Sequence, residues 1–130
     1  GYILGGLVTG ANAADTSHLE DILNEVMLEE GFPVLGDKGY TSAKNSNILE
    51  SKNLENRLML KATKSKKLTD EEKQFNKDIS KYRYVVEQTF GLLKLHFGFT
   101  KLRYIGKRKV ELEYLLKSLS FNIKKASYSL

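Results

Sequence analysis

The chain has 130 residues, of which 41% are hydrophobic and 28% charged, an ordinary composition for one globular domain. It contains no cysteine, so disulfides and thiolate metal sites are excluded, and carboxylates that hold magnesium or manganese become the natural candidates. The 21 Lys and Arg residues outnumber 16 Asp and Glu residues, a balance that suits a polyanionic partner. No apolar run reaches the roughly 20 residues that span a bilayer, so we expect a cytoplasmic protein without a membrane partner.

The first half of the chain alternates between strand and helix patterns. Residues 2–9 read as a buried strand that continues from something upstream, and Ser17 and Glu20 have the spacing of a capping box for a helix that stops at Gly31. Further along, the pattern predicts a strand at 32–37, a short helix at 42–53 and a strand at 55–62. This β-α-β-α-β order predicts an α/β fold with helices packed on the faces of a sheet.

The second half is mostly helical. After a lysine-rich loop at 62–67, Thr69 and Glu72 form a second capping box for a long helix that ends near Phe97, with Gly98 as the stop. A basic connector at 100–109 leads to a final helix, which carries several leucines on one face: Leu112, Leu115, Leu116 and Leu119.

The long helix combines an apolar stripe with a charged edge. At about 100° per residue, one narrow arc holds Ile79, Tyr82, Val86, Phe90, Leu93 and Phe97. Arg83, Glu87 and Lys94 lie together at the edge of that arc, so we expect Glu87 to be half shielded at the rim of the core. The competing interpretation is an ordinary Arg–Glu pair four residues apart on an amphipathic helix.

Asp37 also has two interpretations. In the stretch VLGDKGY it follows a strand directly, and Asp before Lys-Gly is typical of a turn or cap residue. Ligand-binding and catalytic groups in α/β sheets, however, gather at the carboxyl ends of the strands, which is where Asp37 falls.

Two segments, GDKGYTS and YRYVVEQTFGLLKLHFGFTKLRYIG, resemble the C-terminal half of the DDE transposases of bacterial insertion sequences. The resemblance implies a ribonuclease-H-like mixed sheet with flanking helices, here incomplete at the N-terminus and followed by C-terminal helices. Residues 1–130 would then be a single domain, the C-terminal portion of a catalytic domain. In that family two aspartates and a glutamate hold two Mg²⁺ or Mn²⁺ ions that support DNA cleavage and strand transfer.

The resemblance assigns roles to individual residues. Asp37 matches the second metal-binding aspartate and Glu87 the glutamate, while Arg83 and Lys94 match basic positions that hold the DNA end. Ser80 stands where many members have a tyrosine, and Tyr40 keeps the aromatic residue after the glycine. The first aspartate would lie upstream of this chain. Asp15 is either a helix-start residue, which the helix dipole favours, or a substitute ligand.

Further contacts to double-stranded DNA are expected from the basic connector. Its candidates are Lys101, Arg103, Lys107, Arg108 and Lys109, together with the loop lysines, although such lysines are often simply solvated. Tyr104 either stacks on a base or, as we expect, anchors the connector in the core. The two histidines, His18 and His96, are expected to be surface or partly packed residues.

Three functions remain after the sequence is considered. The leading hypothesis is a transposase core fragment that is inactive by itself and whose full-length enzyme is a homo-oligomer. The alternative is a remnant that binds DNA or a partner but cuts nothing, and a structural protein with an accidental motif is the third. A chain that lacks its first strand would expose a sheet edge, so we expect marginal stability or self-association.

Overall fold

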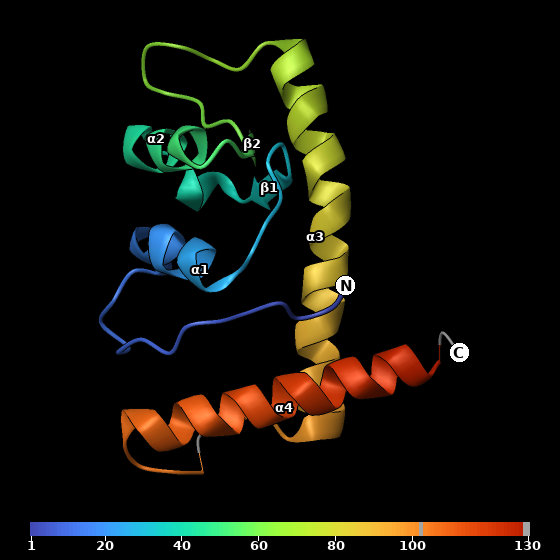
Figure 1. The fold of residues 1–130 in the computed structure, drawn as a ribbon. Helices are drawn as coiled ribbons and strands as arrows, with labels where there is room; N and C mark the ends of the chain where they lie inside the picture. Colours follow the sequence, from blue (N-terminus) through green and yellow to red (C-terminus); the bar gives the residue numbers. More distant parts are fainter. Residues whose placement is uncertain (102, 129–130) are drawn as a thin grey trace. The chain divides into compact units, whose positions relative to one another are not determined.

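The computed structural model describes residues 1–101 and 103–128, so Leu102 of the connector and the last two residues of the final predicted helix lie outside the described residues. Its elements are η1 (Asp15–His18), α1 (Leu19–Glu25), β1 (Pro33–Gly36), η2 (Lys38–Tyr40), α2 (Ala43–Ser51), β2 (Glu55–Leu58), α3 (Asp70–Phe97) and α4 (Lys107–Ser127) (Figure 1). They form two compact units, the sheet unit (Ala11–Arg83) and the helix unit (Gly1–Gly10 with Tyr84–Leu130). The expectation of a single domain stays a prediction.

The sheet unit is built on a parallel pair of strands. β1 pairs with β2, with Pro33 opposite Glu55 and Gly36 opposite Leu58, and α2 forms the connection between them, as parallel strands require. The strand predicted at 32–37 and the helix predicted at 42–53 are therefore confirmed, and the strand predicted at 55–62 is confirmed in its first half. Ser42 is the N-cap of α2, and its Oγ accepts a hydrogen bond of 3.1 Å from the backbone N–H of Asn45.

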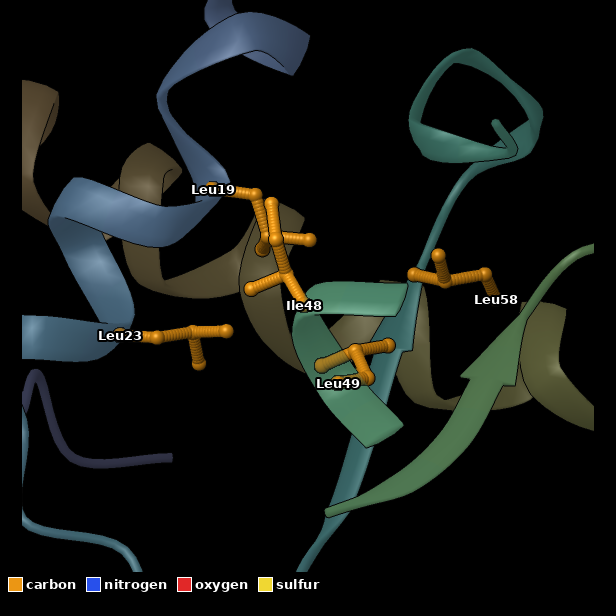
Figure 2. Packing of buried hydrophobic residues seen from close by; sticks show 5 residues of the cluster. All are labelled: Leu19, Leu23, Ile48, Leu49 and Leu58. Atoms are coloured by element: carbon orange, nitrogen blue, oxygen red, sulfur yellow. The ribbon is translucent and has the colours of Figure 1, made fainter. Parts of the chain in front are cut away.

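A small hydrophobic core lies between α1, α2 and the strands. Figure 2 shows its side chains, and the cluster consists of Leu19, Leu23, Ile48, Leu49 and Leu58. Leu49 is fully buried, with 0% of its surface exposed. Because each buried leucine removes a full side chain from water, this cluster supplies much of the stability of the sheet unit.

The predicted strand at residues 2–9 is wrong. This segment has no regular structure, and among the described residues the sheet has two strands. Its backbone bonds instead to side chains of α4: the Ile3 N–H donates to Asn122 Oδ1 (2.9 Å), and Asn122 Nδ2 donates to the Ile3 carbonyl (2.6 Å). A strand needs a neighbouring backbone to form a ladder, and here a side-chain amide takes that place.

The first predicted helix is shorter than its pattern suggests. The Ser17 hydroxyl donates to the Ala14 carbonyl (2.6 Å) and does not cap a helix, so the expected box with Glu20 is absent. The chain first makes the turn η1, and α1 then ends at Glu25 because Val26 is already extended. Because the Ser17 side chain bonds to the Ala14 carbonyl, it does not cap α1.

The second capping box is confirmed. The Thr69 N–H donates to Glu72 Oε2 (2.8 Å), and the Glu72 N–H donates to Thr69 Oγ1 (3.2 Å). The Thr69 N–H, and then Lys66, lower the pKa of Glu72 below its ordinary value. At the other end of α3, Gly98 has a φ of 61°, a left-handed conformation that suits glycine and ends the helix as predicted.

In the helix unit, α4 runs across the C-terminal end of α3 (Figure 1). The rings of Phe97 and Phe121 meet edge to face with centroids 6.1 Å apart. Lys117 Nζ donates to Glu113 Oε1 (2.5 Å) and to the Gly98 carbonyl (3.2 Å), which joins α4 to the end of α3. The ammonium of Lys117 is the main reason that the pKa of Glu113 is lowered.

The leucine face of α4 is not part of the core. Its predicted members are more than half exposed: Leu112 55%, Leu115 62%, Leu116 53% and Leu119 54%. The buried positions of α4 are Val110, Glu113, Ser118 and Phe121. Among the helices described, none is long and apolar enough to cross a membrane.

Candidate functional site

Asp37 occupies a fixed turn at the carboxyl end of β1. It follows Gly36, the last residue of the strand, and its Oδ1 accepts a hydrogen bond of 2.8 Å from the backbone N–H of Gly39. A Cβ on Gly39 would lie 3.0 Å from this Oδ1 and 3.3 Å from Thr16 Cγ2. The turn interpretation is therefore confirmed, and so is the position at the end of a strand; the carboxylate itself is exposed.

A buried asparagine on α2 is hydrogen-bonded to the segment that contains the Asp37 turn. Asn45 is 3% exposed, and its Nδ2 donates to the carbonyls of Tyr40 (2.7 Å) and Thr16 (3.2 Å). Two turns, η1 and η2, are thereby tied to α2. The Thr41 hydroxyl adds a bond of 2.5 Å to the Met59 carbonyl at the end of β2. Sequence reasoning missed Asn45, because both of its partners are backbone groups that no side-chain pattern marks.

Tyr40 has a raised pKa, and two nearby aspartates contribute to the shift. Burial raises the pKa of Tyr40, and the negative charges of Asp15 and Asp37 raise it further. Asp15 is the first residue of η1, which leads into α1, so the helix-start interpretation is confirmed. A role for Asp15 as a substitute ligand stays a prediction.

Glu87 lies on an exposed part of α3, so the expectation of a half-shielded carboxylate is wrong. Its neighbours Arg83 and Lys94 are exposed as well. The apolar stripe of α3 is buried at Ile79 (3% exposed), within the sheet unit, and at Leu93 (2%), within the helix unit. The middle of the predicted stripe is exposed: Tyr82 64%, Val86 55% and Phe90 48%. A periodic pattern shows which residues share a face, but only packed neighbours bury that face.

The two carboxylates belong to different units. Asp37 lies in the sheet unit and Glu87 in the helix unit, so their meeting in one metal site stays a prediction. Within either unit, as far as it is described, no group of three or more His, Asp or Glu side chains is placed to hold a metal ion.

The basic connector is exposed, as a DNA-contacting segment must be. Its described candidates are Lys101, Arg103, Lys107, Arg108 and Lys109. Lys107 Nζ lies 3.6 Å from Glu111 Oε1, and a backbone N–H of Arg103 helps to lower the pKa of Glu113. Tyr104 is 52% exposed, so its expected role as a buried anchor is wrong and the stacking interpretation stays open.

The histidines are placed as predicted. His18 is half-buried, and its Nδ1 lies 2.9 Å from Asp21 Oδ2. His96 is exposed near the end of α3. Both are surface or partly packed residues.

Comparison with known proteins gives the family. The profile described as "Transposase DDE domain" matches residues 1–123. The chain is 38% identical over 120 residues to a protein of Neisseria meningitidis serogroup B named "Transposase for insertion sequence element IS1106". The alignment covers 92% of this chain and 41% of the relative, so the chain spans well under half of that protein's length. No solved structure matches. The family match over nearly the whole chain, with this relative, shows that the chain belongs to the DDE-type transposases of insertion sequences.

Proposed function

We propose that this chain forms part of a ribonuclease-H-like catalytic core that cleaves DNA at the ends of an insertion sequence and joins them to a target. The observation that carries the proposal is the placement of Asp37 in a fixed turn at the end of β1, followed in chain order by Glu87 on a long helix. The family match spans both residues.

Asp37 and Glu87 are the proposed metal ligands. Carboxylate oxygens are the ligands that Mg²⁺ and Mn²⁺ prefer, and both side chains are exposed to an incoming ion. Asp37 Oδ1 accepts the hydrogen bond from the Gly39 N–H. This bond fixes the carboxylate and leaves Oδ2 to coordinate a metal ion. When bound, a pair of divalent ions supplies charge stabilisation for the attacking and leaving oxygens of a phosphodiester. The contribution of this chain would be to hold one carboxylate in a hydrogen-bonded turn at the end of β1 and the other on the long helix α3, and not on a flexible loop.

Basic residues are proposed to bind the DNA backbone. Arg83 and Lys94 share the face of α3 that carries Glu87, and further phosphate contacts come from Lys101, Arg103, Lys107 and Arg108. An arginine offers a planar fork of donors that matches a phosphate, whereas a lysine acts as a point charge. The full-length enzyme would work in the cytoplasm as a homo-oligomer on transposon ends and target DNA.

A second candidate is a chain that binds DNA without cutting it. Two carboxylates are fewer than the three that the family uses, and neither unit, as described, gathers three such groups. We therefore expect that the 130-residue chain alone binds DNA in a salt-dependent way and leaves it intact.

A chimera tests the catalytic proposal. Residues of this chain replace the 120-residue matching segment of the Neisseria relative, and cleavage of labelled element ends is followed in Mg²⁺. Asp37→Asn and Glu87→Gln are each expected to lower cleavage by at least about a hundredfold, because even changes in groups around metal ligands cost 10–100-fold.

Glu71→Gln is the matched control, since Glu71 is another exposed carboxylate on α3. It is expected to leave cleavage intact. Strand transfer that survives Glu87→Gln would contradict the ligand assignment. A folded, DNA-binding chimera that cuts nothing even without substitution would favour the second candidate.

A further inference from the structure

A hollow within the helix unit combines aromatic and basic side chains. It has a volume of about 350 Å³ and lies where the C-terminal end of α3 meets the second half of α4. Its described lining consists of Gln88, Leu92, His96, Phe97, Phe121, Lys124, Lys125 and Tyr128. This volume falls in the range of about 300–1,000 Å³ that is typical of small-molecule sites.

Two ammonium groups stand over the rings in this hollow. Lys124 Nζ lies 5.9 Å from the centroid of Phe97. Lys125 Nζ lies between two rings, 6.0 Å from the centroid of Phe121 and 5.7 Å from that of Tyr2, which is outside the lining. Neither lysine forms an ion pair with a carboxylate among the described residues, and none of the described lining residues is acidic. Two adjacent positive charges without a carboxylate between them favour an anionic ligand.

The aromatic side chains that line the hollow differ in exposure. Phe121 is buried, with 5% of its surface exposed, whereas Tyr128 is 79% exposed. Phe97 is half-buried and meets Phe121 edge to face. An exposed tyrosine and a half-buried phenylalanine in the lining of one hollow offer ring surface to a planar ligand.

The hollow is distinct from the proposed metal-binding face. On α3, Leu92 lies about 140° and His96 about 180° around the helix axis from Glu87. A ligand in the hollow therefore sits on another side of the helix from Glu87, Arg83 and Lys94, and none of these three lines it.

A nucleotide combines a negatively charged phosphate with a planar base whose face stacks on aromatic rings. We propose that the hollow binds one nucleotide of single-stranded DNA, with its phosphate between Lys124 and Lys125 and its base against Phe97 and Tyr128. Basic grooves with aromatic side chains are the usual way in which proteins hold single strands without reading their sequence. The nucleotide site stands on the geometry of the hollow, whereas its assignment to a DNA strand rests on the proposed function.

The test measures binding of the 130-residue chain to a fluorescent oligothymidylate of about eight nucleotides, within the usual site size. Fluorescence anisotropy is recorded without divalent metal, so the result is independent of Asp37 and Glu87. The double variant Lys124→Gln with Lys125→Gln is expected to weaken binding by about tenfold or more, because it removes two phosphate contacts. The control, Lys44→Gln with Lys77→Gln, removes the same charge from exposed positions of the sheet unit and is expected to have a much smaller effect.

A second variant separates the base from the phosphate. Tyr128→Ala is expected to weaken binding of the oligothymidylate by about tenfold, within the range for loss of one base–aromatic stack. Tyr128→Ala should not change binding of an abasic strand of the same length. Tyr128→Phe keeps an aromatic ring and should bind the oligothymidylate as well as the parent chain does. Circular dichroism checks that each variant is folded.

Two results would overturn the proposal. If Lys124→Gln with Lys125→Gln weakens binding no more than Lys44→Gln with Lys77→Gln does, binding reflects general electrostatic attraction and not a site in the hollow. Binding of free thymidine monophosphate without binding of the oligothymidylate would remove the assignment to a DNA strand.

Discussion

The sheet unit and the helix unit differ in how firmly they hold the residues of the candidate site. In the sheet unit, Asp37 sits in a hydrogen-bonded turn backed by Asn45 and by a core of leucines and isoleucine. In the helix unit, the buried apolar residues are Leu93, Val110 and Phe121, and the leucine face of α4 is exposed. Glu87 lies on an exposed face of α3. One carboxylate is thus preorganised by its own unit, whereas the other depends on the helix that carries it.

This difference teaches that preorganisation is a local property in this chain. The Asp37 turn needs only contacts between residues 11 and 83. The long helix supplies Glu87 with a rigid backbone, but its apolar stripe is exposed at Tyr82, Val86 and Phe90. We infer that changes in the sheet unit affect stability and site together, whereas changes near Glu87 affect function with little effect on stability.

The sharpest contrast is expected between two leucines. Leu49→Ala removes a fully buried side chain from the sheet unit and should lower the free energy of unfolding by about 2–5 kcal/mol. Leu116→Ala trims a side chain that is 53% exposed and should change it by less than about 0.5 kcal/mol. Urea unfolding followed by circular dichroism measures both, and equal effects would contradict the burial of Leu49 and the exposure of Leu116.

Asn45→Ala tests the support behind the Asp37 turn. The substitution leaves the carbonyls of Thr16 and Tyr40 without their donor, which should cost about 1–3 kcal/mol. Asn47→Ala is the control, because Asn47 is exposed on the same helix. If both variants unfold at the same urea concentration, Asn45 does not hold the turn.

A smaller effect is expected at Asp37 itself. Asp37→Ala loses the acceptor for the Gly39 N–H and should cost about 1 kcal/mol, as for other cap residues. Asp37→Asn keeps an oxygen acceptor and should be nearly as stable as the parent chain while it loses the proposed metal ligation. Thermal melts of both variants check this, and an equal loss in Asp37→Asn would mean that the charge, not the hydrogen bond, stabilises the turn.

The smallest expected effect concerns the pH dependence of the capping box. The lowered pKa of Glu72 means that its carboxylate stabilises the fold above the ordinary value of 4.5 and that this contribution is lost as the pH falls through the lowered value. Glu72→Gln keeps the box but carries no charge. The variant should therefore lose less stability than the parent between neutral pH and about pH 3 in urea titrations. If Glu72→Gln and the parent chain lose the same stability over this pH range, the Glu72 charge does not stabilise the fold.

Helix ends and strand ends were predicted better than the burial and pairing of whole segments. The capping box of Thr69 and Glu72 and the stop at Gly98 need only a few neighbouring residues, and both are confirmed. The box predicted for Ser17 and Glu20 is as local but is wrong, because the Ser17 hydroxyl bonds to the Ala14 carbonyl instead. Residues 2–9 have the composition of a strand, but strand formation depends on a partner backbone that composition does not reveal.

The candidate site was also predictable only in part. The position of Asp37 at a strand end could be predicted from VLGDKGY, whereas the bonds of Asn45 to Thr16 and Tyr40 join segments that are far apart in sequence. The exposure of Glu87 could not be predicted either, because a helical stripe indicates a shared face and not what covers it.

The most direct test of the ligand assignment replaces each carboxylate by a thiolate. The chain has no cysteine, so Asp37→Cys or Glu87→Cys in the chimera introduces the only such group in this segment. Because thiolates are poor ligands for Mg²⁺ and better ones for softer ions, each variant should be inactive in Mg²⁺ and should regain end cleavage in Mn²⁺ or Zn²⁺. A Glu87→Cys chimera that cleaves DNA in Mg²⁺ as well as the parent does would contradict the account.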